Sequence, residues 1–267
     1  THRVFSRNTS SSRAVPSKKM SYWSENIFYP SHWGKNKPGM SASEELTGYK
    51  LFLSKSLWGA SAICAFSLHW LLSKLGGHKQ WVNRIIEPYL YTKQIITTSE
   101  LENFFALRIH EDAQPEIQIL AKTMFLAYNE PHEFQILGEN DWHLPYVNIE
   151  GDSYYAEGES TPLTEQQAIL TSVSACAQVS YRATDFSLEK SKRIFKMLNV
   201  FDKENPVHAS PLEHQARVLP KEKWPIGATH IDRDGNLWSG NLRGFAQLRH
   251  ILAQSHPKET IRILGDM

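Results

Sequence analysis

Cysteine is scarce in this chain of 267 residues, which contains only Cys64 and Cys176. Neither has a metal-type spacing to other ligands, and two cysteines do not form the disulfide framework of a small secreted domain. Both lie among apolar or small residues, so we expect two buried thiols in a reducing compartment, the cytoplasm. The twelve histidines include no helical pair with a third ligand in reach, so no metal site is predicted.

Long apolar runs and glycine-rich phosphate loops are also missing. The longest apolar run, residues 57–72, is interrupted by Ser61, Ser67 and His69 and falls short of the roughly 20 residues that span a bilayer. We therefore predict a core helix there and no membrane partner. The formal net charge of +1 gives no overall attraction to nucleic acid, and a hydrophobic share of 41% is typical of a globular protein.

Acidic residues are absent before Glu25, and the opening segment is rich in donors. Residues 2–13 include Arg3, Arg7 and Arg13 together with His2 and four serines. A guanidinium binds phosphate oxygens two at a time, and hydroxyl and backbone N–H groups fill the remaining acceptor positions. The segment predicts a site for a phosphorylated ligand, with a solvated basic arm or a nucleic-acid patch as the alternative.

The spacing in this segment, His-Arg followed by seven residues and then Ser-x-Arg, resembles the signature of flavin-dependent thymidylate synthases. Residues 84–92 are similar to that family's Ala-Arg-x-x-Leu-Pro-x-x-x-Tyr-Thr stretch. Residues 103–117 are similar to its Asn-Phe-x-x-Leu-Arg-x-x-x-x-Ala-Gln-x-Glu-Ile helix, a specific match because it fixes eight positions.

Two later stretches, residues 178–181 and 208–214, resemble motifs that precede the arginine signature in the family. Here they follow it, so the order is rotated, which a compact domain tolerates when its termini lie close together. Residues 30–40 and 239–245 resemble a phage-type branch of the family. Because Thr1 already stands inside a motif, we expect further residues in front of it.

The resemblance implies an α+β fold, in which a helix-rich domain packs on a small antiparallel sheet. Residues 1–267 would form a single domain, with the nucleotide signature and helical part in 1–130, a connection in 131–165 and a part like the family's N-terminal region in 166–267. The implied activity is the methylation of dUMP to dTMP. FAD is the implied cofactor, methylenetetrahydrofolate and NADPH are the co-substrates, and the implied assembly is a homotetramer with shared sites and no obligate nucleic acid.

The resemblance also assigns residues. Ser11, Ser12 and Arg13 take the dUMP phosphate, Arg84 is a second clamp on the nucleotide, and Arg108 lies against the uracil as the catalytic residue. A permanently charged guanidinium stabilises an ionised ring without any proton transfer. The FAD contacts carried over are His2, Arg3, Asn103, Ser180 and His214.

Ion pairs on a helix face are the alternative interpretation of two of these residues. Arg108 would pair with Glu111 or Asp112, and Arg84 with Glu87. Either ion pair would account for its arginine without a bound nucleotide.

Several family positions are altered in this chain. Thr1, Thr9 and Ala14 replace the usual Arg, Glu and Tyr, and residues 97–99 read Thr-Thr-Ser where the family has Asn-x-Arg. Asn241 and Arg243 supply an Asn-x-Arg pattern again, and we hypothesise that they return to the pocket. Two rival functions follow from the losses: a related pyrimidine C5 hydroxymethylation, and a non-catalytic protein that binds a nucleotide or nucleic acid.

Helix signals divide the remaining chain. We predict helices over 43–75, ended by Gly76-Gly77, from about 79, over 99–128 with Ser99 as N-cap and a bend at Pro115, and over 164–181, 188–198 and 242–254. Residues 132–165 predict a hairpin or an irregular connection. Asp234-Gly235-Asn236 predicts a tight turn.

Overall fold

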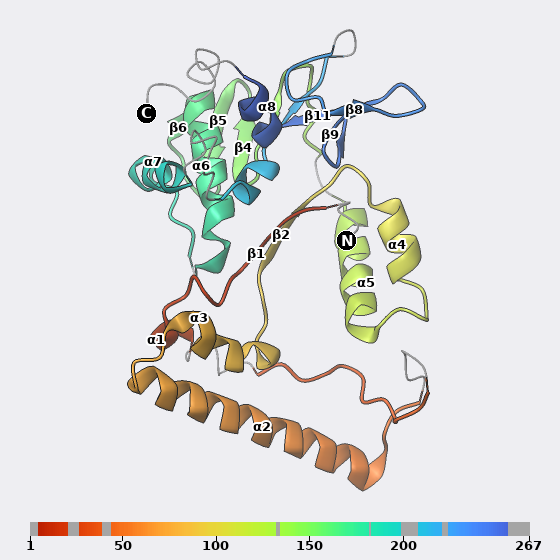
Figure 1. Ribbon diagram of the computed structural model, residues 1–267. Coiled ribbons are helices and arrows are strands. Elements are labelled where there is room, and N and C mark those ends of the chain that lie inside the picture. The colour runs from red at the N-terminus through yellow and green to blue at the C-terminus, as the bar shows by residue number, and fades with distance from the viewer. Residues whose placement is uncertain are drawn as a thin grey trace. The chain divides into compact units, whose positions relative to one another are not determined.

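The computed structural model describes residues 5–20, 27–38, 44–131, 134–181, 183–198, 208–220 and 224–255. The chain divides into two compact units. Unit 1 comprises Thr1–Thr9, Lys93–Glu100 and Phe134–Met267, and unit 2 comprises Ser10–Thr92 and Leu101–Glu133. Helices and small antiparallel sheets occur together, so the fold is α+β (Figure 1).

The core of unit 1 is built around helix α6, Glu165–Ala177. Thr164 and Gln167 form a reciprocal capping box at its start, and every residue from Ala168 to Cys176 is buried. Helices α7 (Leu188–Met197) and α8 (Leu248–Gln254) and the 3-10 helices η4 (Gln178–Ser180) and η5 (Ser210–Glu213) complete the helical part. The largest core side chains are Trp142, Phe195, Ile169, Leu212, Leu248 and Ile251.

The described strands of unit 1 form four antiparallel sheets. Strand β1 (Ser6–Thr9) pairs with β2 (Gln94–Thr97), and β11 (Phe245–Gln247), β7 (Ala216–Val218) and β3 (Trp142–His143) follow one another in a second sheet. The third contains β4 (Val147–Glu150), β5 (Ser153–Ala156) and β6 (Pro162–Leu163). The fourth contains β8 (His230–Ile231), β9 (Leu237–Ser239) and β10 (Leu242–Arg243).

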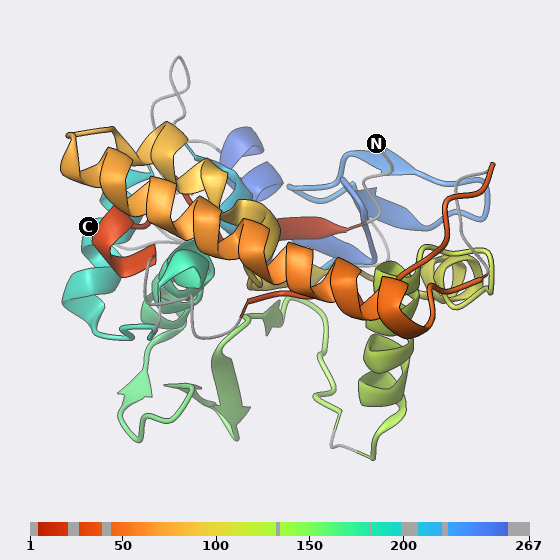
Figure 2. The ribbon, with the colours of Figure 1, turned by 90° about the horizontal axis from the view of Figure 1, so that it is seen from below.

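Unit 2 is helical in its described part. It contains α1 (Ser17–Met20), α2 (Gly48–Lys74), α3 (Lys79–Val82), the 3-10 helices η2 (Asn83–Ile85) and η3 (Glu87–Tyr89), α4 (Glu102–Arg108) and α5 (Pro115–Asn129). Figure 2 shows α1 and α3 beside the C-terminal half of α2, where Val15, Met20, Ala65 and Ile86 form a small core. Phe105 on α4 meets Phe125 on α5 edge to face, with ring centroids 5.2 Å apart.

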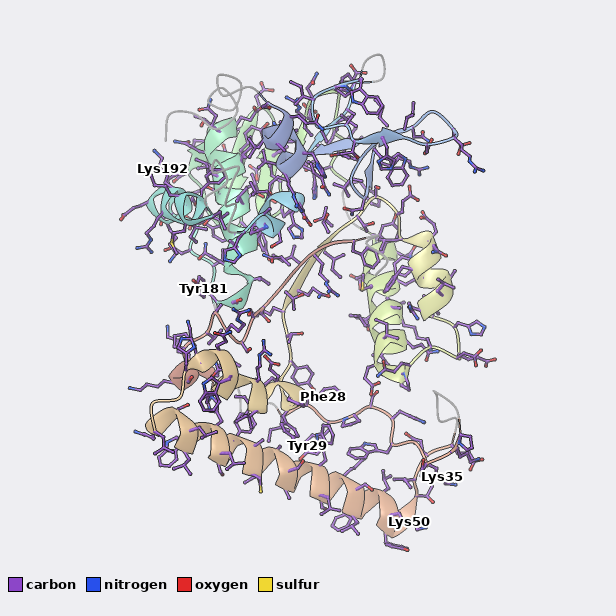
Figure 3. All side chains as sticks on the ribbon, in the orientation of Figure 1. Phe28, Tyr29, Lys35, Lys50, Tyr181 and Lys192 are labelled. Carbon is purple, nitrogen blue, oxygen red and sulfur yellow. The ribbon has the colours of Figure 1, made fainter. Side chains whose placement is uncertain are left out.

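Helix α2 is not the core helix that its composition predicts. Only Ala62, Ala65 and His69 are buried along its 27 residues, and most of its large apolar side chains are exposed. Cys64 is exposed as well, so the prediction of a buried thiol is wrong for Cys64 and confirmed for Cys176. By length and composition alone, α2 qualifies as a candidate membrane span. Its outward side chains are visible as sticks in Figure 3.

Two predicted helices have different bounds in the structure. The single helix over 99–128 is two helices, because Pro115 occupies the first turn of α5, where its missing N–H costs nothing. Ser99 is not an N-cap, since α4 begins only after Leu101. The last helix begins at Leu248 and not at Leu242, because residues 242–247 contribute strands β10 and β11.

Other local predictions are confirmed. The helices over 164–181 and 188–198 are present as α6 with η4 and as α7, and residues 132–165 contain the β4–β5 hairpin. Gly76 has a φ of +84° just after α2, which is a conformation that glycine adopts without strain. The start of the helix predicted over 43–75 is wrong: α2 begins at Gly48, and the described residues 44–47 are not helical, with Glu45 paired to Gly34 in a β-bridge.

Candidate functional site

A buried polar network joins the first strand of unit 1 to residues near the end of the chain. Ser6 on β1 is fully buried and donates its hydroxyl to Asn241 Oδ1 at 3.0 Å. Gln247 Nε2 donates to Ser6 Oγ at 2.9 Å and to Asn241 Oδ1 at 3.0 Å, and the Gln247 backbone N–H donates to Ser239 Oγ. Bonds in such a low-dielectric setting fix one arrangement of the segments that contribute them.

Asn8, two residues further along β1, is bonded to the region around α6 and η5. Its Nδ2 donates to the Cys176 carbonyl at 2.7 Å, and Ser210 Oγ donates to its Oδ1 at 3.3 Å. Alternate residues of a strand point to the same face, so Ser6 and Asn8 anchor one face of β1 to the rest of unit 1. Burial raises the pKa of the Cys176 thiol to about 12, so this thiol is protonated at neutral pH.

His214 follows η5 and is completely enclosed by protein. Its Nδ1 lies 2.9 Å from Thr97 Oγ1 at the end of β2, while Nε2 has no hydrogen-bond partner within the described chain. Burial, and to a lesser extent the charge of His143, lower the pKa of His214 to about 4. The imidazole is therefore neutral at pH 7 and holds β2 to η5.

Arg243 on β10 contacts the residues that follow β2. Its backbone N–H donates to Ser99 Oγ at 2.8 Å, and its Nε lies 2.7 Å from Glu100 Oε1. The Arg243 side chain is about half exposed. The structure thus brings the Asn-x-Arg pattern of residues 241–243 to Ser99 and Glu100, next to the residues where the resemblance leads one to expect that pattern.

The predicted phosphate residues lie on a loop of unit 2 that is held by a buried asparagine. Asn83 Nδ2 donates to the carbonyls of Ser12 at 2.7 Å and Val15 at 2.9 Å, and Asn83 Oδ1 lies 3.0 Å from Nε2 of the buried His69. Four loop residues are thereby fixed next to Arg84, the residue that follows Asn83.

Basic side chains and the Glu87 carboxylate lie around this loop. Arg13 and Arg84 are exposed, and neither has an ion-pair partner among the described residues. Lys79 Nζ donates to the Ala14 carbonyl at 3.3 Å. Glu87 bonds with the Ser12 hydroxyl and not with Arg84, so the ion pair expected as the alternative is not formed.

Arg108 and Asn103 lie on α4, and both are exposed. Arg108 makes no ion pair with Glu111 or Asp112; the Asp112 carboxylate instead lies 3.4 Å from His110 Nδ1. Gln118 on α5 donates to the carbonyls of Ile109 and His110 and so fixes the chain just after Arg108. The guanidinium is left available to an anionic partner.

The predicted site residues are therefore distributed over several places. Unit 2 carries Ser11, Ser12, Arg13 and Arg84 in one group and Asn103 and Arg108 in another. Unit 1 carries the buried Ser180 and His214, and His2 and Arg3 lie outside the described residues. The predictions of a single domain and of these individual roles stay predictions.

Four residues of the unit 1 network were missed from the sequence: Ser6, Asn8, Gln247 and Glu100. Ser6 and Asn8 alternate within the arginine-rich segment, and that alternation was an available signal for a strand with one polar buried face. Gln247 and Glu100 had no such signal, because their partners are distant in sequence. The described residues contain no group of three or more His, Cys, Asp and Glu side chains suited to a metal ion.

Compared with known proteins, the chain matches no protein-family model, no curated protein and no solved structure.

Proposed function

We propose that this chain is a flavin-dependent thymidylate synthase that methylates dUMP, with the fold of that family and a rotated order of its motifs. One observation carries the proposal. Four segments meet around β1 and β2 in unit 1. Residues 6–8 lie between the two parts of the arginine signature, residues 97–100 include the place where the resemblance leads one to expect Asn-x-Arg, and residues 208–214 and 239–247 contain two of the later resemblances. Such contacts are what a rotated but intact domain requires.

The phosphate of dUMP is assigned to the loop of unit 2. Arg13 and Arg84 supply guanidinium groups that are not neutralised by a described carboxylate, and guanidinium–phosphate bonds are charge-assisted. Asn83 fixes the loop backbone before a ligand binds, which lowers the entropy lost on binding. Ser11 and Ser12 are the further donors that the resemblance assigns, and the Ser12 hydroxyl, which donates to Glu87 here, would have to turn to the phosphate.

Arg108 is assigned to the uracil ring. A guanidinium placed against the ring carbonyl stabilises the negative charge that develops when C5 becomes nucleophilic, and it does so at any physiological pH. The helix that carries it is fixed at its C-terminal end by Gln118. When bound, FAD supplies the hydride that completes the methyl group.

The described donors fit FAD in part. Asn103 and Arg243 are accessible and have the amide and guanidinium chemistry that binds ring carbonyls and phosphates. His214 and Ser180 are buried in the single chain, so we assign to His214 the positioning of β2 in place of a direct contact. In a homotetramer with shared sites, Asn103 and Arg108 would serve a neighbouring subunit.

The test is the nucleotide product. The purified protein is incubated with dUMP, methylenetetrahydrofolate, FAD and NADPH, and the product is identified by mass. We expect dTMP that depends on FAD, a loss of at least a hundredfold in rate for Arg108→Ala, and a rate near wild type for Arg193→Ala, an exposed arginine on α7.

Other products would decide between the rivals. A hydroxymethyl nucleotide would replace this proposal with C5 hydroxymethylation. Unchanged dUMP together with steeply salt-dependent DNA binding would leave a binding protein without catalysis.

A further inference from the structure

Helix α2 carries two apolar stripes on opposite faces. The first, Leu51, Trp58, Ala62, Ala65 and His69, faces the rest of unit 2 and is partly or fully buried. The second is exposed along the whole helix and recurs every three or four residues. Its members are Tyr49, Leu53, Leu57, Ala60, Cys64, Leu68, Leu71 and Leu75.

The exposed stripe has a nearly palindromic order of side-chain sizes. Ala60 and Cys64 are small and stand at its centre, two leucines follow on either side, and Tyr49 and Leu75 close the ends. When two such helices pack antiparallel about the centre, Leu53 meets Leu71, and the small central residues let the helices approach closely. The antiparallel arrangement also places opposite helix dipoles side by side.

The exposed apolar area of this stripe approaches what a stable contact needs. Its six large members are about half or more exposed: Tyr49, Leu53, Leu57, Leu68, Leu71 and Leu75. At about 100 Å² each they present on the order of 600 Å², against about 800 Å² for one partner in a standard protein interface. Monomeric proteins rarely expose apolar patches beyond a few hundred Å².

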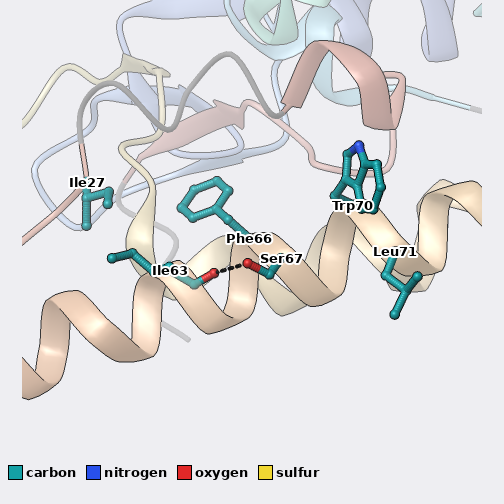
Figure 4. Close-up of a pocket in the computed structure, with 6 residues that line it drawn as sticks. All are labelled: Ile27, Ile63, Phe66, Ser67, Trp70 and Leu71. Carbon is teal, nitrogen blue, oxygen red and sulfur yellow. Dashed lines mark hydrogen bonds between the residues drawn. The ribbon is translucent and has the colours of Figure 1, made fainter.

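A hollow next to the stripe offers room for side chains of a partner. Figure 4 shows Ile63, Phe66 and Trp70 on α2 with Ile27 on the neighbouring chain. The space that they line has a volume of about 720 Å³. Ser67 donates its hydroxyl back to the Ile63 carbonyl, so it does not present an unsatisfied donor to this space. The hollow is apolar and continuous with the stripe at Leu71.

The first stripe argues against a lipid partner. Trp58 Nε1 donates to the Phe28 carbonyl at 2.8 Å, and His69 bonds with Asn83, which in turn holds Ser12 and Val15. A helix that spanned a bilayer would draw the irregular chain bonded to it into hydrocarbon, where lipid-exposed irregular backbone does not occur. A helix lying on a bilayer has Lys and Arg along its length, whereas residues 56–73 contain neither.

We propose that α2 is a self-association surface, on which a second copy of this chain packs its own α2 in antiparallel orientation. The proposed function already implies a homotetramer, and this proposal adds the surface and the orientation of one contact; it would stand without a nucleotide or flavin site, because it rests on α2 alone. The contact is isologous: both copies use the same surface, so this contact joins two copies and no more.

The mass of the full chain in solution tests the association. We expect the wild-type protein to be dimeric or larger by light scattering, and Leu57→Glu with Leu68→Glu to halve that mass at unchanged circular dichroism. Ile136→Glu, at a residue that is 92% exposed, is the matched control and keeps the wild-type mass. A monomeric wild type, or an assembly that the α2 variant leaves unchanged, would overturn the proposal.

Cross-linking tests the orientation. Cys176 is buried, so a short bifunctional maleimide reports on Cys64 and should join two copies near the centre of the stripe. In a Cys64→Ser background, Leu53→Cys should not self-link, because the two positions would lie about 27 Å apart along antiparallel helices. Self-linking at 53 would overturn the antiparallel arrangement.

A vesicle experiment tests the lipid alternative. If the protein floats with phosphatidylcholine–phosphatidylglycerol vesicles, and the variant with Leu57→Glu and Leu68→Glu does not, α2 binds lipid and the proposal of a protein partner is overturned.

Discussion

The Nε atom of Arg243 lies 2.7 Å from Glu100 Oε1, and the Arg243 backbone N–H donates to Ser99 Oγ at 2.8 Å. Strand β10, near the end of the described chain, is thereby tied to the residues that follow β2. At residues 97–99 the resemblance leads one to expect an arginine, and the sequence has Thr-Thr-Ser. A guanidinium from a distant part of the chain stands beside that altered segment.

Replacing Arg243 should weaken FAD binding while changing the stability of the fold only slightly. Because the ion pair is partly exposed, Arg243→Ala should lower the free energy of unfolding by no more than about 1 kcal/mol. Under the proposed function it should weaken FAD binding at least tenfold, measured by quenching of flavin fluorescence. Arg233→Ala, in the β8–β9 hairpin, is the control and should change neither quantity. Unchanged FAD affinity in Arg243→Ala would remove Arg243 from the flavin site.

His214 should make stability depend on pH in the acidic range. Its pKa is about 4 in the folded chain and about 6.5 when unfolded, so the unfolded state binds more protons between these values. The corresponding stability is fully present above pH 6.5 and is lost as the pH falls through about 4, a difference of about 3 kcal/mol. His214→Gln should flatten this part of the curve in urea unfolding from pH 7 to 4. Parallel curves for the two proteins would contradict the assignment.

Elements that the sequence predicted well have their signals in adjacent residues. Thr164 and Gln167 cap α6 reciprocally, and Gly235 has a φ of +84° in the turn at residues 234–236. Each signal acts within one turn of chain and needs no tertiary partner. Ser99 carried an equally good N-cap signal, yet its hydroxyl accepts from Arg243. A contact across the fold determined its role.

The orientation of α2 and the unit 1 network illustrate what local patterns leave open. Helix α2 is apolar on opposite faces, so its periodicity did not indicate which face is covered. Ser6 bonds with Asn241 and Gln247, which lie more than 200 residues further along the chain. Only the resemblance of motifs suggested that Asn241 and Arg243 belong near the earlier segments. They contact Ser6, Ser99 and Glu100 in unit 1, and their return to a flavin pocket stays a hypothesis.

Two glycines distinguish crowding from backbone strain. Gly227 and Gly158 both have positive φ, at +95° and +76°. A Cβ at Gly227 would lie 2.8 Å from side-chain atoms of Ala246 and Ile251, whereas nothing lies within 4 Å at Gly158. We expect Gly158→Ala to lower the free energy of unfolding by about 1–2 kcal/mol and Gly227→Ala by about 1–3 kcal/mol more. Equal losses in urea unfolding would show that the packing around Gly227 relaxes freely.

Gln247 tests whether the buried network acts as a unit. The side chain is 2% exposed and donates to both Ser6 and Asn241. Gln247→Met keeps the volume but leaves two buried oxygens without this donor, so the free energy of unfolding should fall by about 1–3 kcal/mol. Gln118→Met, which removes two donors from a partly exposed glutamine on α5, should cost less.

The same network makes a prediction about additivity. Ser6→Ala removes the hydroxyl that both receives from Gln247 and donates to Asn241. The two changes share partners, so Ser6→Ala with Gln247→Met should cost less than the sum of the single variants, by about 0.5 kcal/mol or more in urea unfolding. Strict additivity would mean that Ser6 and Gln247 are not coupled, and their contact would then give no support to an intact, rotated domain. A coupled pair would instead place the arginine-rich segment and the late Asn-x-Arg pattern in one cooperative unit.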